Sequence, residues 1–581
     1  MRWAAEGGKG REGAGREKEI PGKKSGRGIF QDSGIFSDAK DFFRIGKNKF
    51  YLMLAVVFIG IALRAYFFNS TDITWDEAFH IMLGYKIGAI LSLYPIVAVA
   101  FAAILAAFVY FSAIKPNQKI QFLFLVAGIV AVYFFSVSPV LHPRHPPLFS
   151  LAVAPLTMLG TTPLMAAYII NTISALLMAF SAFFLARTFF SEKAAIFAFA
   201  FVMLSPYNIF YSASAYITPL ADSLMFTGLA LFFIAFEKNR SLVPLAALLL
   251  AGAFFTRYTT LMALPVLGIY LILKRNEVAF YENRNNYAPA LLILATTMLV
   301  LFPAILSSFS GFANWTTATT ADLYLRDIPH YSAYLMDFFG ENPIKPQQLF
   351  FVKEMLAFYS VGFVAIFLVG AYFALRKKNA LLVSLLAMFA AYFIFYSMQK
   401  NFQDMNYLLE LEFIMLFVTA VFLSELKIGA GAMTMGNIFA AGLCAVFLLS
   451  SVFLITSHNF TGLSETVAKI PEGKTIFTDF IDPVKYYRGE YVKDRTLNNR
   501  AFAIITQIFG QQAEPAHSTI VFSNDPIDSL PEKPDYAILT QLYFDEGKTS
   551  KEMEKCGEIK EGNIVVFYVF AENKGLCDAM Q

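Results

Sequence analysis

The chain is poor in cysteine. Its 581 residues include only three, at Cys444, Cys556 and Cys577. They make neither a disulfide scaffold nor a zinc site, because Cys444 lies within an apolar block and the other two are far apart in a polar tail. Cys556 and Cys577 could form a disulfide only if that tail lies outside the cytosol.

Several sequence signals are also lacking. The chain shows no repeat of fixed period, no coiled-coil heptads and no matching pair of Gly/Pro-broken segments of the kind found in inverted-repeat transporters. Residues 1–49 are rich in Gly, Lys and Arg without apolar periodicity, and they lack the apolar region and cleavage site of a signal peptide. We therefore expect a disordered basic cytosolic tail, followed by an apolar block that remains as an anchor.

Hydrophobic residues, in contrast, are abundant. They make up 57% of the chain, whereas ordinary globular proteins contain about 45–50%. They fall in blocks of about 17 to 25 residues, the length that crosses a bilayer as a helix. The sequence therefore predicts a polytopic α-helical membrane protein with about thirteen crossings. The blocks lie near 50–68, 91–114, 120–140, 163–187, 194–211, 219–236, 242–256, 258–273, 288–309, 352–374, 380–398, 406–425 and 434–456, where 242–273 could be one broken helix or two short ones.

The distribution of charge predicts the orientation. The formal net charge is only +3, and the basic residues cluster in alternate loops, such as Lys115 with Lys119 and the run 376–378. This pattern excludes a nucleic-acid-binding patch and places the N-terminus in the cytosol. The odd number of crossings then places the tail from residue 457 outside. It also places outside the loops 69–90, 141–162, 212–218, 310–351 and 399–405. If the protein is prokaryotic, the membrane is the cell membrane.

The tail from 457 to 581 differs from the rest of the chain. Short β-rich runs, among them TIFTDF and GNIVVFYVF, alternate with turn-forming Pro, Gly, Asn and Asp. We expect a small extracytoplasmic α/β domain.

The first outside loop carries Asp72 and the adjacent acids Asp76 and Glu77. One reading is structural: Thr74 or Asp76 caps a surface helix that begins near Glu77. The other is catalytic, because transfer of a sugar to a hydroxyl group needs a carboxylate that takes the proton of the acceptor. Asp76 or Glu77 could act as this general base.

The next outside segment reads VLHPRHPPLF. Its two prolines can begin a helix of about fourteen residues that ends at Gly160 and lies along the membrane interface. His142, Arg144 and His145 would then lie at the water boundary. They are either snorkelling cations of a surface anchor or a polar rim for an anionic headgroup.

Three further positions stand out within or beside apolar blocks. Asp222 lies near the outer end of a helix, where an ionisable group is usually retained for function. Arg257 is a lone cation between apolar stretches, suited to phosphate or simply snorkelling at a helix end. Tyr407 could be an ordinary aromatic belt residue. The long loop 310–351, with Arg326 and His330, could cover a site or bind the acceptor.

Taken together, these motifs resemble those of GT-C membrane glycosyltransferases, specifically the dolichyl-phosphate-mannose protein mannosyltransferase and lipid A aminoarabinose transferase branch. The resemblance covers about residues 50–456, as a GT-C-like transmembrane domain in which 91–140 forms an inserted hairpin. It rests on the order of WDE at 75–77, HPPL at 145–148, Asp222, TRY at 256–258 and YLL at 407–409.

The resemblance implies an inverting transfer from a polyprenyl- or dolichyl-phosphate-linked hexose or pentose to a hydroxyl of a protein, glycan or lipid. Asp76 would be the catalytic base with Glu77 beside it, and Asp222 a second acidic residue. The residues near the phosphate of the donor would be His145, Arg257 and Tyr407.

Two questions stay open at this point. Asp76, Glu77 and Asp222 could supply oxygen ligands to a divalent cation, although the favoured branch need not use one. A transporter or flippase of lipid-linked sugars is the main alternative, but it would need charges near the bilayer midplane and access from both sides. A receptor that displays the tail would not need so many crossings.

Overall fold

A computed structural model describes twelve main stretches of the chain. These are residues 46–68, 72–73, 75–93, 148–278, 285–298, 350–397, 407–426, 434–457, 462–490, 519–521, 527–540 and 552–580, apart from a few positions within them and with isolated positions between 99 and 110. The chain divides into two units, 1–52 and 53–581. The features described below belong to the second unit, except for the beginning of the first helix.

Helices make up most of the described residues between 46 and 457. They are α2 (Lys47–Phe67), α3 (Trp75–Leu93), α6 (Leu148–Met158), α7 (Pro163–Phe189), α8 (Glu192–Leu204), α9 (Pro206–Ser212), α10 (Thr218–Glu237), α11 (Val243–Phe254), α12 (Ala263–Leu273), α15 (Phe350–Lys377), α16 (Ala380–Ser397), α17 (Leu408–Glu425) and α18 (Met435–Ser457). Five of the described helices are long and apolar enough to cross a membrane, or six if α8 and α9 form one bent span. This finding supports an integral membrane protein, while the total of about thirteen crossings stays a prediction.

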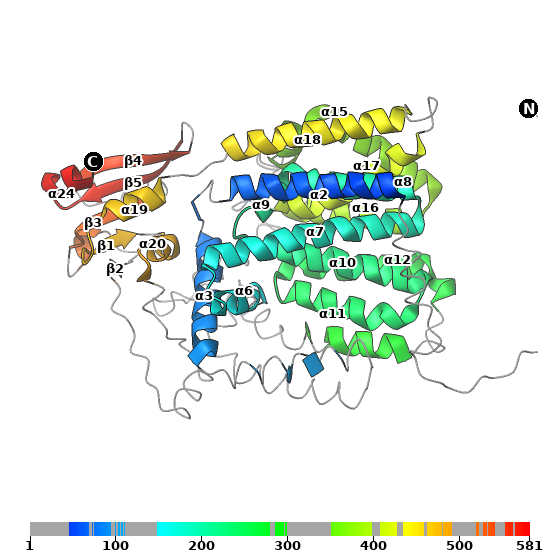
Figure 1. Ribbon diagram of the computed structural model, residues 1–581, viewed down its shortest axis with the longest axis horizontal. Helices are drawn as coiled ribbons and strands as arrows, with labels where there is room; N and C mark the ends of the chain where they lie inside the picture. Colours follow the sequence, from blue (N-terminus) through cyan, green and yellow to red (C-terminus); the bar gives the residue numbers. More distant parts are fainter. Residues whose placement is uncertain are drawn as a thin grey trace, which may run out of the picture. The chain divides into compact units, whose positions relative to one another are not determined.

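The helix boundaries follow local sequence signals. Thr162 caps α7 by accepting a hydrogen bond from the Met165 amide at 3.3 Å, and Pro163 occupies the first turn. Helices α7, α10 and α11 lie side by side (Figure 1). A Cβ on Gly228 of α10 would lie 2.8 Å from the Leu250 side chain of α11, so this glycine permits the close approach of the two helices.

Two of the predicted crossings are broken. The block 194–211 is divided at Ser205 into α8 and α9, which are bent by 49°. The block 242–273, for which the sequence left one broken helix or two short ones open, consists of α11 and α12 on either side of the 3-10 helix η4 (Tyr258–Met262). Arg257 lies in this second break.

The helix predicted after the two prolines is present as α6. It begins at Leu148, directly after them, and Gly160 follows its end with a φ of 91°. Its residues Phe149, Val153 and Ala154 are buried, and α6 packs against α3. It is therefore part of the packed structure on at least one face.

A five-stranded sheet lies near the C-terminus, coloured orange to red in Figure 1. The strand order is β2-β1-β3-β5-β4, with β1 parallel to β2 and β3, and β5 antiparallel to β3 and β4. The strands are β1 (Ile476–Thr478), β2 (Ile520–Val521), β3 (Tyr536–Thr540), β4 (Glu554–Glu561) and β5 (Ile564–Ala571), and the short helices are α19 (Leu463–Lys469), α20 (Ile481–Tyr487) and α24 (Lys574–Met580). Apolar residues of both the strands and these helices form one buried cluster.

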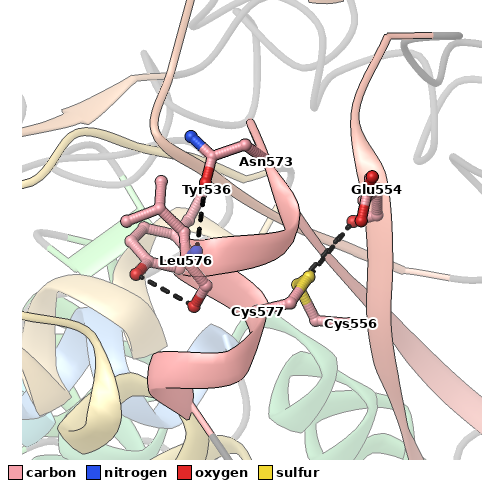
Figure 2. Close-up of a disulfide and its surroundings, with 6 residues drawn as sticks. All are labelled: Tyr536, Glu554, Cys556, Asn573, Leu576 and Cys577. Atoms are coloured by element: carbon pink, nitrogen blue, oxygen red, sulfur yellow. Dashed lines mark hydrogen bonds between the residues drawn. A yellow bond between two sulfur atoms is a disulfide. The ribbon is translucent and has the colours of Figure 1, made fainter.

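A disulfide fastens the last helix to the sheet. It joins Cys556 of β4 to Cys577 of α24, with Cα atoms 5.0 Å apart, as Figure 2 shows. The Asn573 side chain accepts a hydrogen bond from the Leu576 amide at 3.1 Å and so caps the first turn of α24. The two cysteines that were separated in the sequence are thus brought together by the pairing of β4 with β5 and the return of the chain through α24.

Candidate functional site

The acidic pair lies in the first turn of α3. The helix begins at Trp75, close to the predicted start, so Asp76 is its second residue. The side chain of Asp76 is outside the described residues. The Glu77 side chain is 3% exposed, and its Oε1 accepts a hydrogen bond from the Ala215 amide at 2.9 Å. Glu77 therefore ties α3 to the segment that precedes α10.

That segment, residues 213–217, is held from a second side as well. The Asn171 side chain of α7 donates to the carbonyl oxygens of Ser214 and Tyr216, both at 2.8 Å. These bonds satisfy backbone groups that would otherwise be buried without a partner. They fix the point at which α10 begins, and thereby the position of Asp222 one turn further along.

Asp222, Arg257 and Glu410 form a buried charged cluster. Arg257 Nη1 donates to Thr218 Oγ1 at 3.0 Å and lies 3.4 Å from Glu410 Oε1. Asp222 and Glu410 are both fully buried, and Glu410 and Arg257 are the charged groups that act most strongly on Asp222. Neither carboxylate oxygen of Asp222 has a hydrogen-bond partner among the described residues. Charges interact strongly here because little water screens them.

Aromatic rings complete this arrangement. The Arg257 guanidinium lies 4.7 Å from the centre of the Tyr407 ring, which stacks on Tyr396 at 4.5 Å. The Tyr396 hydroxyl donates to Glu410 Oε1 at 3.0 Å. We call this group the arginine cluster, composed of Thr218, Asp222, Arg257, Tyr396, Tyr407 and Glu410. It brings together three of the residues singled out in the sequence, and Tyr407 contacts the arginine rather than standing alone in a belt.

Two further buried charged residues, Arg64 and Glu412, lie at the break between α8 and α9. Arg64 of α2 donates to the carbonyl oxygen of Met203, in the last turn of α8, at 3.2 Å and to Ser212 Oγ at 2.5 Å. Glu412 of α17 accepts hydrogen bonds at the start of α9, including that of the Tyr207 amide. A cation thus meets the C-terminal end of one helix and an anion the N-terminal end of the next, as the helix dipoles favour.

Sequence reasoning missed Arg64, Glu410 and Glu412. All three were counted within apolar blocks, and a charge inside a membrane span is itself the signal that could have identified them. Other predicted site residues lie outside the described residues, namely Arg144, His145, Arg326 and His330. Within the described part of the chain, no group of three His, Cys, Asp or Glu side chains could hold a metal ion.

Comparisons with known proteins bear on this geometry. Residues 144–334 match the family described as dolichyl-phosphate-mannose-protein mannosyltransferase, a segment that contains Asp222 and Arg257. The apo crystal structure of ArnT from Cupriavidus metallidurans superposes with a TM-score of 0.50 at 11% identity, over 90% of this chain and 98% of ArnT. The chain has the GT-C fold. The GT-C fold that the sequence motifs led us to expect is confirmed.

Two further solved structures are similar to the chain at lower TM-scores. ArnT from the same organism bound to undecaprenyl phosphate gives a TM-score of 0.44 at 11% identity, over 79% of this chain and 99% of ArnT. The oligosaccharyltransferase AglB from Archaeoglobus fulgidus, in complex with an inhibitory peptide and a dolichol-phosphate, gives 0.48 at 11% identity, over 85% and 70%. No curated protein has significant sequence similarity to this chain. The family match and the fold together support a membrane glycosyltransferase.

Proposed function

We propose that this GT-C chain moves a sugar from a polyprenyl-phosphate-linked donor to a hydroxyl acceptor on the non-cytosolic face of its membrane. The arginine cluster carries the proposal, since it pairs a buried guanidinium with the buried carboxylate of Glu410. Arg257 and Asp222 both lie within the segment that matches the mannosyltransferase family. The planar fork of an arginine pairs with two phosphate oxygens at once and keeps its charge when buried.

The reaction needs a base that accepts a proton and a cation that stabilises the departing phosphate. The bond between the anomeric carbon and the phosphate oxygen breaks as the acceptor oxygen attacks from the opposite face, which inverts that carbon. Asp76 takes the proton of the acceptor hydroxyl, and Arg257 stabilises the charge that develops on the departing phosphate. Glu410 and Thr218 hold the guanidinium in place.

The remaining predicted residues have supporting roles in this proposal. Arg144 and His145 join Arg257 and Tyr407 around the phosphate of the donor. The loop with Arg326 and His330 covers the site or binds the acceptor, which is a protein, a glycan or a lipid. Glu77 holds the segment before α10.

The location of the cluster favours an enzyme over a transporter. Asp222 and Glu410 lie near the first residues of α10 and α17, and Arg257 lies just before η4, in the break after α11. Charge patterning predicts all three of these helix ends on the outer side. A transporter of lipid-linked sugars needs polar groups that are reached from both sides.

Transfer of radiolabelled sugar tests the proposal. Purified protein in lipid is given a panel of polyprenyl-phosphate sugars, with a membrane extract as acceptor. Asp76→Asn should lower kcat by roughly 10² to 10⁴, the usual contribution of a general base. Asp578→Asn, at an exposed acid in α24, is the matched control and should transfer at the rate of the wild type.

Arg257→Lys tests the phosphate role without removing the charge. Loss of the planar fork should raise the KM for the donor and leave the KM for the acceptor unchanged. Arg240→Lys, at the predicted inner end of the bundle, is the control. If the folded wild type transfers no sugar from any donor, or if Asp76→Asn turns over normally, the proposed function or the assignment of the base is wrong.

A further inference from the structure

The short segment between α2 and α3 is held by residues almost four hundred positions away. The Asp72 carboxylate accepts hydrogen bonds from the Leu463 amide at 2.7 Å and the Ser464 amide at 3.4 Å, across a separation of 391 residues. These are the first two amides of α19. The residue that precedes the helix is Gly462, with a φ of 107° and no side chain for a cap. Asp72 therefore supplies the cap that the local sequence lacks.

A second bond joins the same two regions. The hydroxyl of Tyr487, the last residue of α20, accepts a hydrogen bond from the Ile73 amide at 2.8 Å and also contacts the Asp72 carboxylate. Burial, together with the neighbouring Asp72, raises the pKa of Tyr487 above its ordinary value, so the hydroxyl keeps its proton. Asp72, Ile73 and Tyr487 thus form one connected network, which we call the interdomain tie.

Apolar packing surrounds the interdomain tie. Tyr486 and Tyr487 pack against a buried cluster that includes Ile73, Ile81 and Phe149. Helix α3 in turn packs tightly on α6, because a Cβ on Gly88 would lie 2.4 Å from Thr157 Oγ1. Since packed interfaces of this kind do not deform smoothly, a shift at Asp72 is carried into the first turn of α3.

We propose that Asp72 and Tyr487 are positioning residues for the transfer reaction, through which the C-terminal sheet domain sets the place of Asp76. The inference rests on the proposed function, because Asp76, four residues beyond Asp72, is the proposed base. The sheet domain then contributes to catalysis by positioning Asp76. Changes to its contacts with Asp72 should alter the rate of the chemical step rather than the affinity for the donor.

Steady-state kinetics of the full-length protein test this inference. Asp72→Ala and Tyr487→Phe should each lower kcat by about tenfold to a hundredfold, the cost of a small misplacement of a catalytic group, with the KM for the donor within about twofold of wild type. Asp72→Asn keeps an acceptor oxygen and should recover much of the rate. Tyr536→Phe removes another hydroxyl from the same domain and serves as the control.

Hydrogen exchange gives a readout that does not depend on activity. Asp72→Ala should speed exchange at Leu463 and Tyr487→Phe at Ile73, while the strands of the sheet keep their protection. If the wild type is active and both variants, Asp72→Ala and Tyr487→Phe, have the kcat of the wild type, the positioning role is overturned. Faster exchange throughout the sheet in the variants would mean that the interdomain tie serves folding alone. A wild type that transfers nothing overturns the proposed function instead, and unchanged exchange at Leu463 and Ile73 in the variants would overturn the tie itself.

Discussion

The arginine cluster contains two acids and one base, so removal of its base should cost far more stability than removal of one acid. Asp222 and Glu410 are fully buried, and Arg257 is only 8% exposed. Arg257→Met leaves two buried carboxylates close together without a counter-charge. Glu410→Gln leaves one acid and one base, and its amide can still bond to Tyr396 and Arg257. The two substitutions therefore change the charge balance in opposite directions.

The distance between the charges sets the scale. At 3.4 Å and an effective dielectric constant of about 20, one pair of unit charges interacts by about 5 kcal/mol. Desolvation of both groups offsets part of this energy, and breaking a buried ion pair costs roughly 3–5 kcal/mol. We expect a loss in that range for Arg257→Met. For Glu410→Gln we expect about 1 kcal/mol, because the amide oxygen can still accept the hydrogen bonds of Tyr396 and Arg257, and the Asp222 carboxylate still acts electrostatically on Arg257.

Thermal stability in lipid provides the assay. The protein is heated, and the fraction that remains monodisperse is measured by size-exclusion chromatography. Arg257→Met should lower the apparent midpoint several times more than Glu410→Gln does. Arg240→Met, which removes an arginine stacked on Phe236 at the other end of α10, is the control and should have a small effect. Equal shifts for the two cluster variants, or a larger shift for Glu410→Gln, would refute the reasoning from surplus negative charge.

Three other predictions concern packing, covalent structure and pH. Gly88→Val should destabilise the protein by about 1–3 kcal/mol, because the valine side chain would overlap α6. Gly442→Val is the control and should leave the stability unchanged, because no atom lies within 4 Å of the added Cβ. Thermal midpoints of the two variants test this prediction. Cys577→Ser opens a disulfide between residues 21 positions apart and should lower the free energy of unfolding of the C-terminal sheet by roughly 3 kcal/mol. The tail of the intact protein should then be proteolysed faster. Cys444→Ser, at a free cysteine, is the control and should leave the rate of proteolysis unchanged. Partial burial opposes the ionisation of Asp535, but hydrogen bonds from a lysine and a threonine just before β1 outweigh it and hold the pKa of Asp535 below its usual range. The contribution of Asp535 to stability is therefore complete above the unfolded pKa of about 3.9 and is lost as the pH falls through the lower folded pKa. The protease resistance of Asp535→Asn should then converge on that of the wild type in acid. A difference in protease resistance that stays constant with pH would contradict this.

The sequence was most informative where a local signal decides the structure. The block predicted at 219–236 is α10, from Thr218 to Glu237, because Pro219 can occupy a first turn and a charged stretch follows the helix. The break at Ser205 was missed although Pro206 follows it, and a proline ends the preceding helix because it cannot donate the next backbone bond.

Strand β4 could not be found by its composition. Its sequence, EKCGEIKE, is mostly charged, and it becomes a strand because β5 offers an unpaired edge. The other strands lie in runs that are rich in β-branched and aromatic residues, which is why the tail could be recognised as β-rich.

The partners of the site residues could not be predicted from the sequence either. Asp222, Arg257 and Tyr407 were singled out as lone polar groups in apolar surroundings, and the structure brings them together. Glu410 pairs with Arg257 from 153 positions away, and such a pairing depends on how α10, α16 and α17 pack. The spacing of residues along the sequence does not determine how these helices pack.

The position of Arg64 has a consequence for how the protein is made. Its partners at Met203 and Ser212 lie 139 and 148 residues later in the chain. At a synthesis rate of about 5–20 residues per second, the ribosome needs roughly 7 to 30 s to reach them. During that interval the first helix carries a guanidinium without its final partners. We therefore expect α2 to reach its final packing only when the α8–α9 break has arrived beside it, late in the synthesis of this bundle.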